Sequence, residues 1–404
     1  MAMMMRFEWK KIFERRLNVA AMLLGYVLIA VCVFSYISQA SFYDKDTDSY
    51  VKGIAGIRRA QERDNGQTGE LTDAYVTEVI REIQSYGMDL ESDEAYMEIV
   101  RPLGDIFYFT VNNYSDMREP VGNRNALMQL DLTDGAHFYE QRMKKITDYL
   151  NVDFSFGNYK EAEKEYWIQK AQNTTVPFRW GGKSIMSIIQ DTIMIGFYLV
   201  FVIIICTSSV FSSEYETGAA ALLLTTRHGK KRLVQSKIAV AMLFTAGYLA
   251  VGLLSAVGVI GLLLGFDGAS LPVQLWNSVI PYNMTMAETC MATFAVIVLI
   301  SAALTLVLLC CSAGLRSSLA TLVIGMVIVI APAFFPMSKE SGLWNHINYL
   351  FPVRAMNLKD VLKSFVSYTV GDFVISYTGM IVLVYTLIGM AALPLIRKGF
   401  VKLR

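Results

Sequence analysis

Six stretches of the chain contain no charged residue and no histidine, and each is 18 residues or longer: 17–37, 192–210, 238–266, 290–315, 319–336 and 373–396. An α-helix of 18 residues rises about 27 Å, which approaches the roughly 30 Å hydrocarbon core of a bilayer. Apolar residues make up 54% of the chain and are concentrated in these runs. The pattern predicts an all-α polytopic membrane protein with six transmembrane helices.

Residues 38–184 separate the first run from the second, and this segment is long enough to bury a core of its own. Apolar residues recur in it at helical spacing in three places, which begin at Val76, Tyr96 and Tyr139. Two short segments have the composition of strands: 106–111 and 152–156. We therefore expect a mostly helical (α or α+β) domain. It should fold without disulfides, because all five cysteines lie in or beside the apolar runs.

Lys and Arg are concentrated in alternate connecting segments. Residues 1–16 and the loop 211–237 each hold five basic residues and two acids, and the tail after residue 396 holds four basic residues and no acid. Residues 38–184 hold 17 basic and 25 acidic residues, a net charge of −8. Because cytoplasmic loops are enriched in Lys and Arg, we expect both termini and 211–237 in the cytoplasm. Residues 38–184 are then an extracellular domain, and 185–404 carry transmembrane helices 2–6.

Residues 1–16 predict a short cytoplasmic amphipathic helix. Met5, Trp9 and Ile12 recur at helical spacing, and basic residues occupy the other faces. Such a helix would lie along the inner leaflet. The run 17–37 is too long for the apolar part of a signal peptide and lacks a small-residue cleavage site. We expect it to be retained as transmembrane helix 1.

The chain lacks the motifs of an enzyme. It contains no GxxxxGK[ST] P-loop, no HExxH and no GxSxG, so we expect no ATP binding and no catalysis in this chain. Three histidines, His137, His228 and His346, fall in different loops, and no CxxC pair is present, which predicts no metal site. Asp191 is expected to face water near one end of the second span. Ion-coupled transporters need ionisable groups near the midplane, so the energy for any transport would come from a partner.

The loop 211–237 has the most informative polar sequence. It begins with acids and small residues and then becomes leucine-rich. Glu214 and Glu216 would lie in the positive first turn of a helix, and Gly218 would let another molecule approach closely. We expect one cytoplasmic helix over 214–224.

This loop resembles that of the permease subunits of type 2 ABC transporters, the exporter class with six spans per subunit. In that family the loop shows an acid, a glycine, a leucine-rich run, a threonine and an arginine, and a lysine opens the next span. Here these are Glu214 or Glu216, Gly218, residues 222–224, Thr225, Arg227 and Lys237. A sub-group of the family carries a large extracellular domain between the first two spans, as residues 38–184 would be.

The resemblance implies a plasma-membrane permease coupled to a separate ATPase subunit that binds ATP. It also implies a second permease subunit, as a homodimer or a heterodimer, and no nucleic-acid partner. The residues expected to form the coupling loop are Glu214, Glu216, Gly218, Leu222, Thr225, Arg227 and Gly229.

Two other functions stay open at this stage. The same ATPase partnership would serve a sensor or a mechanical lever that acts through the extracellular domain. A membrane-embedded enzyme or scaffold is the third possibility, although no catalytic motif supports it. The sequence does not identify a substrate.

Overall fold

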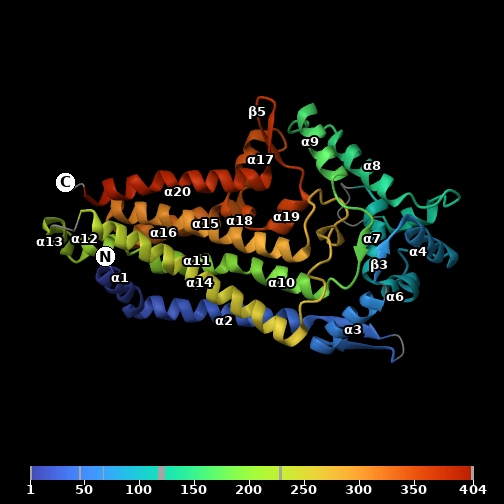
Figure 1. Ribbon diagram of the computed structural model, residues 1–404, viewed down its shortest axis with the longest axis horizontal. Helices are drawn as coiled ribbons and strands as arrows, with labels where there is room; N and C mark the ends of the chain where they lie inside the picture. The colour runs from blue at the N-terminus through green and yellow to red at the C-terminus, as the bar shows by residue number, and fades with distance from the viewer. Residues whose placement is uncertain (1, 45–46, 67, 117–122, 227–229, 402–404) are drawn as a thin grey trace.

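The computed structural model describes residues 2–44, 47–66, 68–116, 123–226 and 230–401. Long apolar helices lie side by side in a bundle, and a second helical region extends from one end of it (Figure 1). Within these described ranges, five helical segments are long and apolar enough to cross a membrane, which indicates a multi-pass membrane protein. They are α2 (Arg16–Gln39), the segment Ser184–Glu216, α14 (Arg232–Leu264), α15 (Met286–Leu315) and α20 (Tyr377–Val401).

The segment Ser184–Glu216 consists of three consecutive helices: α10 (Ser184–Met194), α11 (Gly196–Thr207) and α12 (Ser212–Glu216). The fifth predicted span, over 319–336, is shorter than the others. It contains α16 (Ser318–Ile330) and one further turn, η4 (Ala331–Phe334), which has 3-10 geometry and contains Pro332. Thirteen α-helical and four 3-10 residues rise roughly 27 Å together.

The last span begins later than the sequence predicted. The first four residues of the run 373–396 form a strand, β6 (Phe373–Ser376), which pairs with β5 (Ser367–Val370) in an antiparallel hairpin. Gly371 has φ +62 in the connecting turn, a conformation that favours glycine. Helix α20 therefore starts at Tyr377 and extends to Val401.

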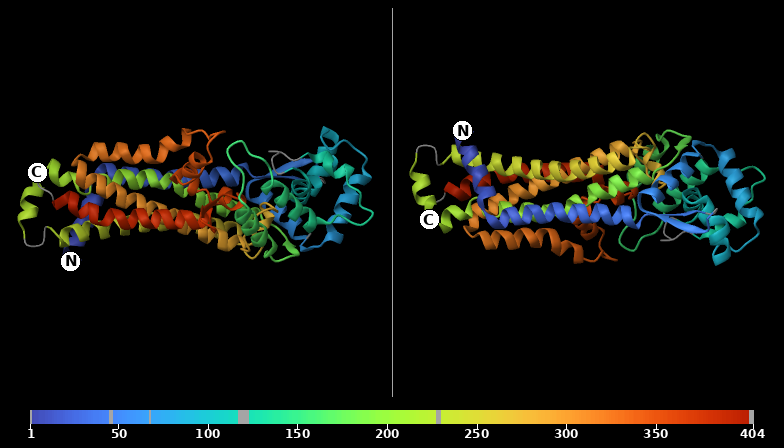
Figure 2. Two further views of the ribbon diagram at one scale, coloured as in Figure 1. Left: turned by 90° about the horizontal axis from the view of Figure 1, so that it is seen from above. Right: turned by 90° about the horizontal axis from the view of Figure 1, so that it is seen from below.

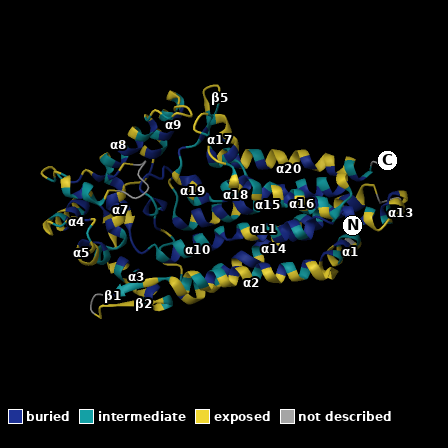
Figure 3. Cartoon of the chain, turned by 180° about the vertical axis from the view of Figure 1, so that it is seen from behind, coloured by how far each residue is buried: buried dark blue, intermediate teal, exposed yellow. Residues whose placement is uncertain are grey.

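Helix α15 lies at the centre of the bundle and packs against α10, α11, α14, α16 and α20. Large apolar side chains on the outer faces of α2 and α20 are exposed, as expected of surfaces that face lipid (Figure 3). Polar side chains of the interior form hydrogen bonds between helices, for example Gln190 Nε2 to Thr293 Oγ1 at 2.8 Å. Thr245 and Thr305 pair in the same way. Such bonds hold membrane helices together where the hydrophobic effect between them is weak.

Residues 40–183 form the distal region, which continues the long axis of the bundle (Figure 2). Its helices are α3 (Gly53–Gly66), α4 (Asp73–Ser85), α5 (Asp93–Ala95), the π-helix η1 (Tyr96–Val100), α6 (Arg101–Leu103), α7 (Asp105–Tyr114), the 3-10 helix η2 (Arg124–Gln129), α8 (Phe138–Leu150) and α9 (Glu161–Gln172). The described part of the region also contains an antiparallel hairpin, β1 (Ser41–Asp44) with β2 (Ser49–Lys52). A second antiparallel pair joins strands far apart in the chain, β3 (Gly69–Leu71) and β4 (Phe178–Trp180).

The helical periodicities that begin at Val76, Tyr96 and Tyr139 are confirmed by α4, η1 with α6, and α8. Both strand predictions were wrong. Residues 106–111 lie inside α7, where buried side chains point to several sides of the helix. Residues 152–156 form an irregular loop that ends in a turn at 155–156. A short apolar run has no period that separates a buried helix from a buried strand, which explains the first error.

The distal region shares one continuous apolar core with the bundle. Connecting elements of the bundle pack between the two: η3 (Val273–Leu275), α17 (Gly342–Tyr349), α18 (Pro352–Ala355) and α19 (Leu358–Lys363). Residues 348–360 are thus divided among three short helices, α17, α18 and α19. Buried Arg142 of α8 donates hydrogen bonds to the carbonyl oxygens of Ala171 and Ile280, at 3.2 Å each, and to that of Ser278. Burial lowers the pKa of this guanidinium to about 10.

The opposite end of the bundle carries α1 (Ala2–Glu14), α13 (Ala219–Thr225) and both ends of the described chain (Figures 1 and 2). The short basic segments therefore share one end, and the acidic distal region lies at the other. We call the first the terminal end. That it faces the cytoplasm stays a prediction.

Candidate functional site

The expected coupling loop forms a helical hairpin, α12 and α13, at the terminal end of the bundle. The prediction of one continuous helix over 214–224 was wrong. Gly218 interrupts it with φ +73, and this residue precedes α13 as its N-cap. An added Cβ at Gly218 would meet no atom within 4 Å. The glycine is therefore explained by its left-handed backbone and not by a close neighbour in this structure.

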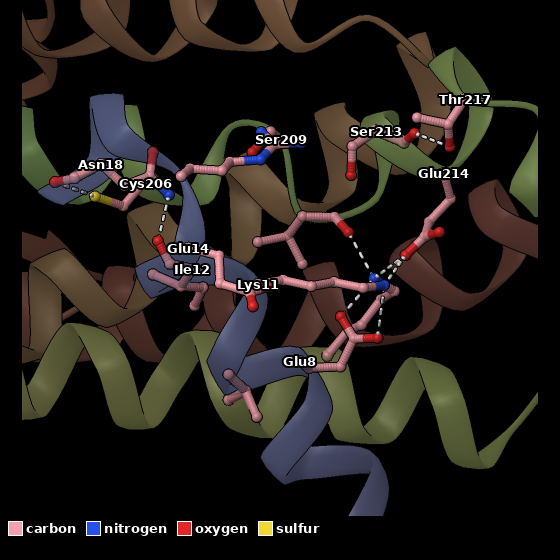
Figure 4. Close-up of a pocket in the computed structure, with 14 residues that line it drawn as sticks. Glu8, Lys11, Ile12, Glu14, Asn18, Cys206, Ser209, Ser213, Glu214 and Thr217 are labelled. Atoms are coloured by element: carbon pink, nitrogen blue, oxygen red, sulfur yellow. Dashed lines mark hydrogen bonds and ion pairs between the residues drawn. The ribbon is translucent and has the colours of Figure 1, made fainter.

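Glu214, which we expected at an interface, is buried and paired within the chain. Its Oε1 accepts from Lys11 Nζ at 2.6 Å and from Lys237 Nζ at 2.7 Å. Lys237 also contacts Glu8 Oε2 at 2.7 Å and donates to the Val210 carbonyl at 2.9 Å. Lys11 contacts the other oxygen of Glu8 at 3.2 Å. Two lysines and two glutamates thus form a closed ionic cluster (Glu8, Lys11, Glu214 and Lys237) that joins α1, α12 and α14 (Figure 4).

The ionic cluster is mostly withdrawn from solvent. The side chain of Lys237 is 1% exposed, those of Glu8 and Glu214 are 6% and 7% exposed, and that of Lys11 is 34% exposed. Its formal charges cancel, two positive against two negative. Because an unpaired charge at such a site would be very costly, the four side chains stabilise the arrangement only as a set.

The pKa of Lys11 reports the balance of these forces. Burial is the largest single influence and lowers that pKa, but the contacts with Glu214 and Glu8 together outweigh it, so the pKa is raised above 10.5. A raised lysine pKa means that the folded state holds the proton more tightly than the unfolded chain does. The cluster therefore contributes through Lys11 at neutral pH, and this contribution is lost only as the pH rises through the raised value.

A pocket of about 300 Å³ opens beside the cluster, between α1 and the end of α11. All four cluster residues line it, and so do Asn18 and Cys206, which lie deeper in the bundle (Figure 4). The side chain of Asn18 donates to the Ile12 carbonyl at 3.0 Å, so it fastens the turn between α1 and α2. The paired charges of the ionic cluster hold α1 against α12 and α14 at this pocket.

The remaining side chains of the hairpin contact other helices or solvent. Glu216 accepts hydrogen bonds from the backbone N–H of Ser318 at 2.6 Å and from its hydroxyl at 2.9 Å, so it ties α12 to the start of α16. Tyr215 donates to the Phe400 carbonyl at 2.7 Å, which joins the hairpin to α20. Leu224 is buried, whereas Leu222 is 73% exposed. Thr225 is also exposed.

Arg227 and Gly229, the last two residues of the expected coupling loop, lie outside the described residues, as does His228. Leu222 and Thr225 are therefore the expected coupling residues that the structure leaves on the surface of α13. Glu214 and Glu216 are engaged with other helices of the same chain. Glu8 and Lys11 were not predicted as partners of this loop. The only sequence signal was their spacing on a short amphipathic helix.

Asp191, expected to face water, has a partner that the sequence did not indicate. Its Oδ1 lies 3.2 Å from Lys359 Nζ of α19, with both side chains 35% exposed. His137 and His346 lie in different parts of the molecule: His137 precedes α8 as its N-cap, and His346 lies on α17. Among the described residues, no group of three or more His, Cys, Asp or Glu side chains is arranged to hold a metal ion.

No protein-family model, curated protein or solved structure matches this chain. The resemblance of the loop 211–237 to ABC permeases rests on the residues of this chain alone.

Proposed function

We propose that this protein is the membrane-spanning permease subunit of an ATP-driven ABC exporter, with six spans and both termini in the cytoplasm. A separate ATPase subunit would dock on the α12–α13 hairpin, and a second permease subunit would complete the pore. ATP would be hydrolysed in the partner.

The observation that carries the proposal is the exposed tip of the hairpin. Helix α13 protrudes from the terminal end of the bundle (Figure 1). The apolar side chain of Leu222, on this helix, is 73% exposed. An exposed leucine on a lipid-facing span has an ordinary explanation, but α13 lies beyond the ends of the spans. Apolar residues at the centre of a polar surface are typical of docking sites.

The internal contacts of the hairpin support a coupling role. Glu214, Tyr215 and Glu216 connect it to α1, α14, α16 and α20. A displacement of α13 by a partner would therefore be transmitted to several spans at once. Coupling of this kind requires a continuous set of contacts that can adopt two arrangements. The contacts of the hairpin with the spans are one of these arrangements.

The test uses two substitutions at one position. Leu222→Asp places a charge at the proposed contact, and Leu222→Met keeps the apolar area. Each variant is purified from its native membrane after mild cross-linking, and the recovered partner must contain a P-loop and hydrolyse ATP. We expect Leu222→Asp to lower the amount of recovered partner at least about tenfold, which corresponds to about 1.4 kcal/mol of binding free energy. Leu222→Met should recover as much partner as the unmodified protein. Equal recovery with both variants, or a partner without ATPase activity, would contradict the proposal.

A second candidate function is a sensor or lever driven by the same ATPase. The continuous apolar core between the bundle and the distal region favours it, because movement of the spans would reach the distal region directly. Reconstitution with the ATPase separates the two functions. An exporter moves a solute into or out of vesicles, whereas a lever hydrolyses ATP and changes the distal region without solute movement.

A further inference from the structure

The distal region and the bundle enclose a cavity of about 530 Å³, which the proposed coupling does not use. Its walls come from the segment 149–163 of the distal region, from α17, and from the segment 364–370 that includes β5. Met380, near the start of the span α20, also lines it. The cavity therefore lies at the level where the last span begins, and its volume is within the range of small-molecule sites.

Buried hydrogen bonds hold the cavity walls in place. Glu163 of α9, 8% exposed, accepts from the Ser367 hydroxyl at 2.7 Å, and Trp167 Nε1 lies 3.4 Å from the same oxygen. On the facing wall, the two ring nitrogens of His346 lie 2.6 Å and 3.0 Å from the carbonyl oxygens of Gly342 and Ser367. These contacts connect α9, β5 and α17. The cavity is thus a built feature of the fold and not a gap between mobile loops.

The lining is rich in aromatic side chains: Tyr149, Tyr159, Tyr349, Phe365 and Tyr368. Apolar side chains at its edge are unusually exposed, with Leu343 at 75%, Val370 at 68% and Phe156 at 39%. An aromatic interior behind an exposed apolar rim, beside the end of a span, fits a molecule that enters from the bilayer surface.

The charge at the rim selects among such molecules. Lys160 lines the cavity, and its ammonium donates to the Thr369 hydroxyl at 2.9 Å. Among the described residues it forms no ion pair with a carboxylate, and the nearby Glu163 carboxylate already accepts from Ser367 and from the Lys160 backbone. An anionic group at the rim would therefore gain a charge-assisted hydrogen bond without displacing an existing ion pair.

We propose that this cavity binds an anionic single-chain amphiphile. Its apolar chain packs against the aromatic lining, and its acidic head contacts Lys160. The site rests on the cavity alone and does not require the ATPase partner, so its test is independent of the proposed export function.

The experiment uses the full chain in phosphatidylcholine nanodiscs, without any partner. Hexadecanoate carrying a photoreactive diazirine is the probe, the matching hexadecanol is the uncharged comparison, and labelled peptides are mapped by mass spectrometry. We expect saturable labelling by the acid in the peptides that contain residues 156–160 and 342–349, competed by unlabelled hexadecanoate. The alcohol should label these peptides at least about fivefold less.

Variants separate the head from the chain. Lys160→Glu should reduce labelling by the acid at least about fivefold, Lys160→Arg should retain it, and Lys144→Glu, at an exposed lysine on α8, should leave it unchanged. Val366→Trp fills the cavity and should abolish labelling at an unchanged melting temperature. If that variant fails to fold, the comparison of Lys160→Glu with Lys160→Arg decides. Non-saturable labelling spread over the spans, or equal labelling of Lys160→Glu and the unmodified protein, would overturn the proposal.

Discussion

Replacement of Lys237 by methionine should destabilise the terminal end of the bundle strongly. The side chain is 1% exposed and lies 2.7 Å from both Glu8 and Glu214. Methionine preserves the volume but removes the charge, so the ionic cluster changes from neutral to a net charge of −1. An uncompensated buried charge typically costs about 3–5 kcal/mol, which is several degrees of melting temperature. The matched control is Lys231→Met, at the exposed N-cap of the same helix, α14. It should change the free energy of unfolding by less than about 0.5 kcal/mol.

A second substitution distinguishes lost charge balance from lost packing. Adding Glu214→Gln to Lys237→Met leaves Glu8 paired with Lys11 and restores neutrality. We expect the double variant to recover at least half of the loss, a coupling energy of about 1–3 kcal/mol. Thermal unfolding in detergent measures the global effect.

Cys206 offers a local measurement, because its buried thiol lines the same pocket. In a protein whose other four cysteines are alanine, its alkylation rate should rise at least about tenfold in Lys237→Met and fall back in the double variant. If Lys237→Met matches Lys231→Met in both assays, or if Glu214→Gln deepens the loss, the four residues do not act as one electrostatic unit.

Four further outcomes are expected. Gly218→Val should destabilise the hairpin by about 1–2 kcal/mol because of its φ of +73, and Gly218→Asn by less, as local hydrogen exchange of α13 would show. Arg142→Met should lower stability by about 2–3 kcal/mol, measured by thermal unfolding, because its carbonyl partners lose a charged donor. Burial is the largest influence on Asp64 and raises its pKa above 3.8, so its contribution to stability falls as the pH rises from 3.8 through the raised value. Asp64→Asn should therefore flatten the melting temperature against pH in that window. A cysteine at exposed Asp134 should react with an impermeant maleimide on intact cells, and reaction only after permeabilisation would reverse the predicted orientation.

Local sequence patterns predicted most of the helices and missed the contacts between them. The periodicity of Val76, Val79 and Ile80 identified α4, since these side chains share one face and are all buried. By contrast, the strand prediction for 106–111 failed because the segment is apolar on several sides, and its helical state is decided by tertiary packing. Uncharged length likewise predicted the last span but not its start, which the β5–β6 hairpin shifts to Tyr377.

The ionic cluster could not be predicted from spacing. Lys11 and Glu214 are 203 positions apart, and Glu8 and Lys237 are 229 apart. No local rule relates residues at such separations. Lys11 and Lys237 are each explained locally as part of a basic flank, and Glu214 as an acid at the start of a helix. The pairing exists only because α1 turns back across the end of the bundle.

The cluster also changes how the loop motif is interpreted. Its acid and its lysine, Glu214 and Lys237, bind each other inside the chain. Contact of either residue with a partner would break a neutral buried set. Leu222 and Thr225 remain on the surface. The motif thus divides into an internal part that holds the hairpin to the spans and an external part available for docking. If the proposed function is correct, Leu222→Asp should lose the ATPase, whereas Lys237→Met should retain the ATPase and lose the coupling of its hydrolysis to the spans.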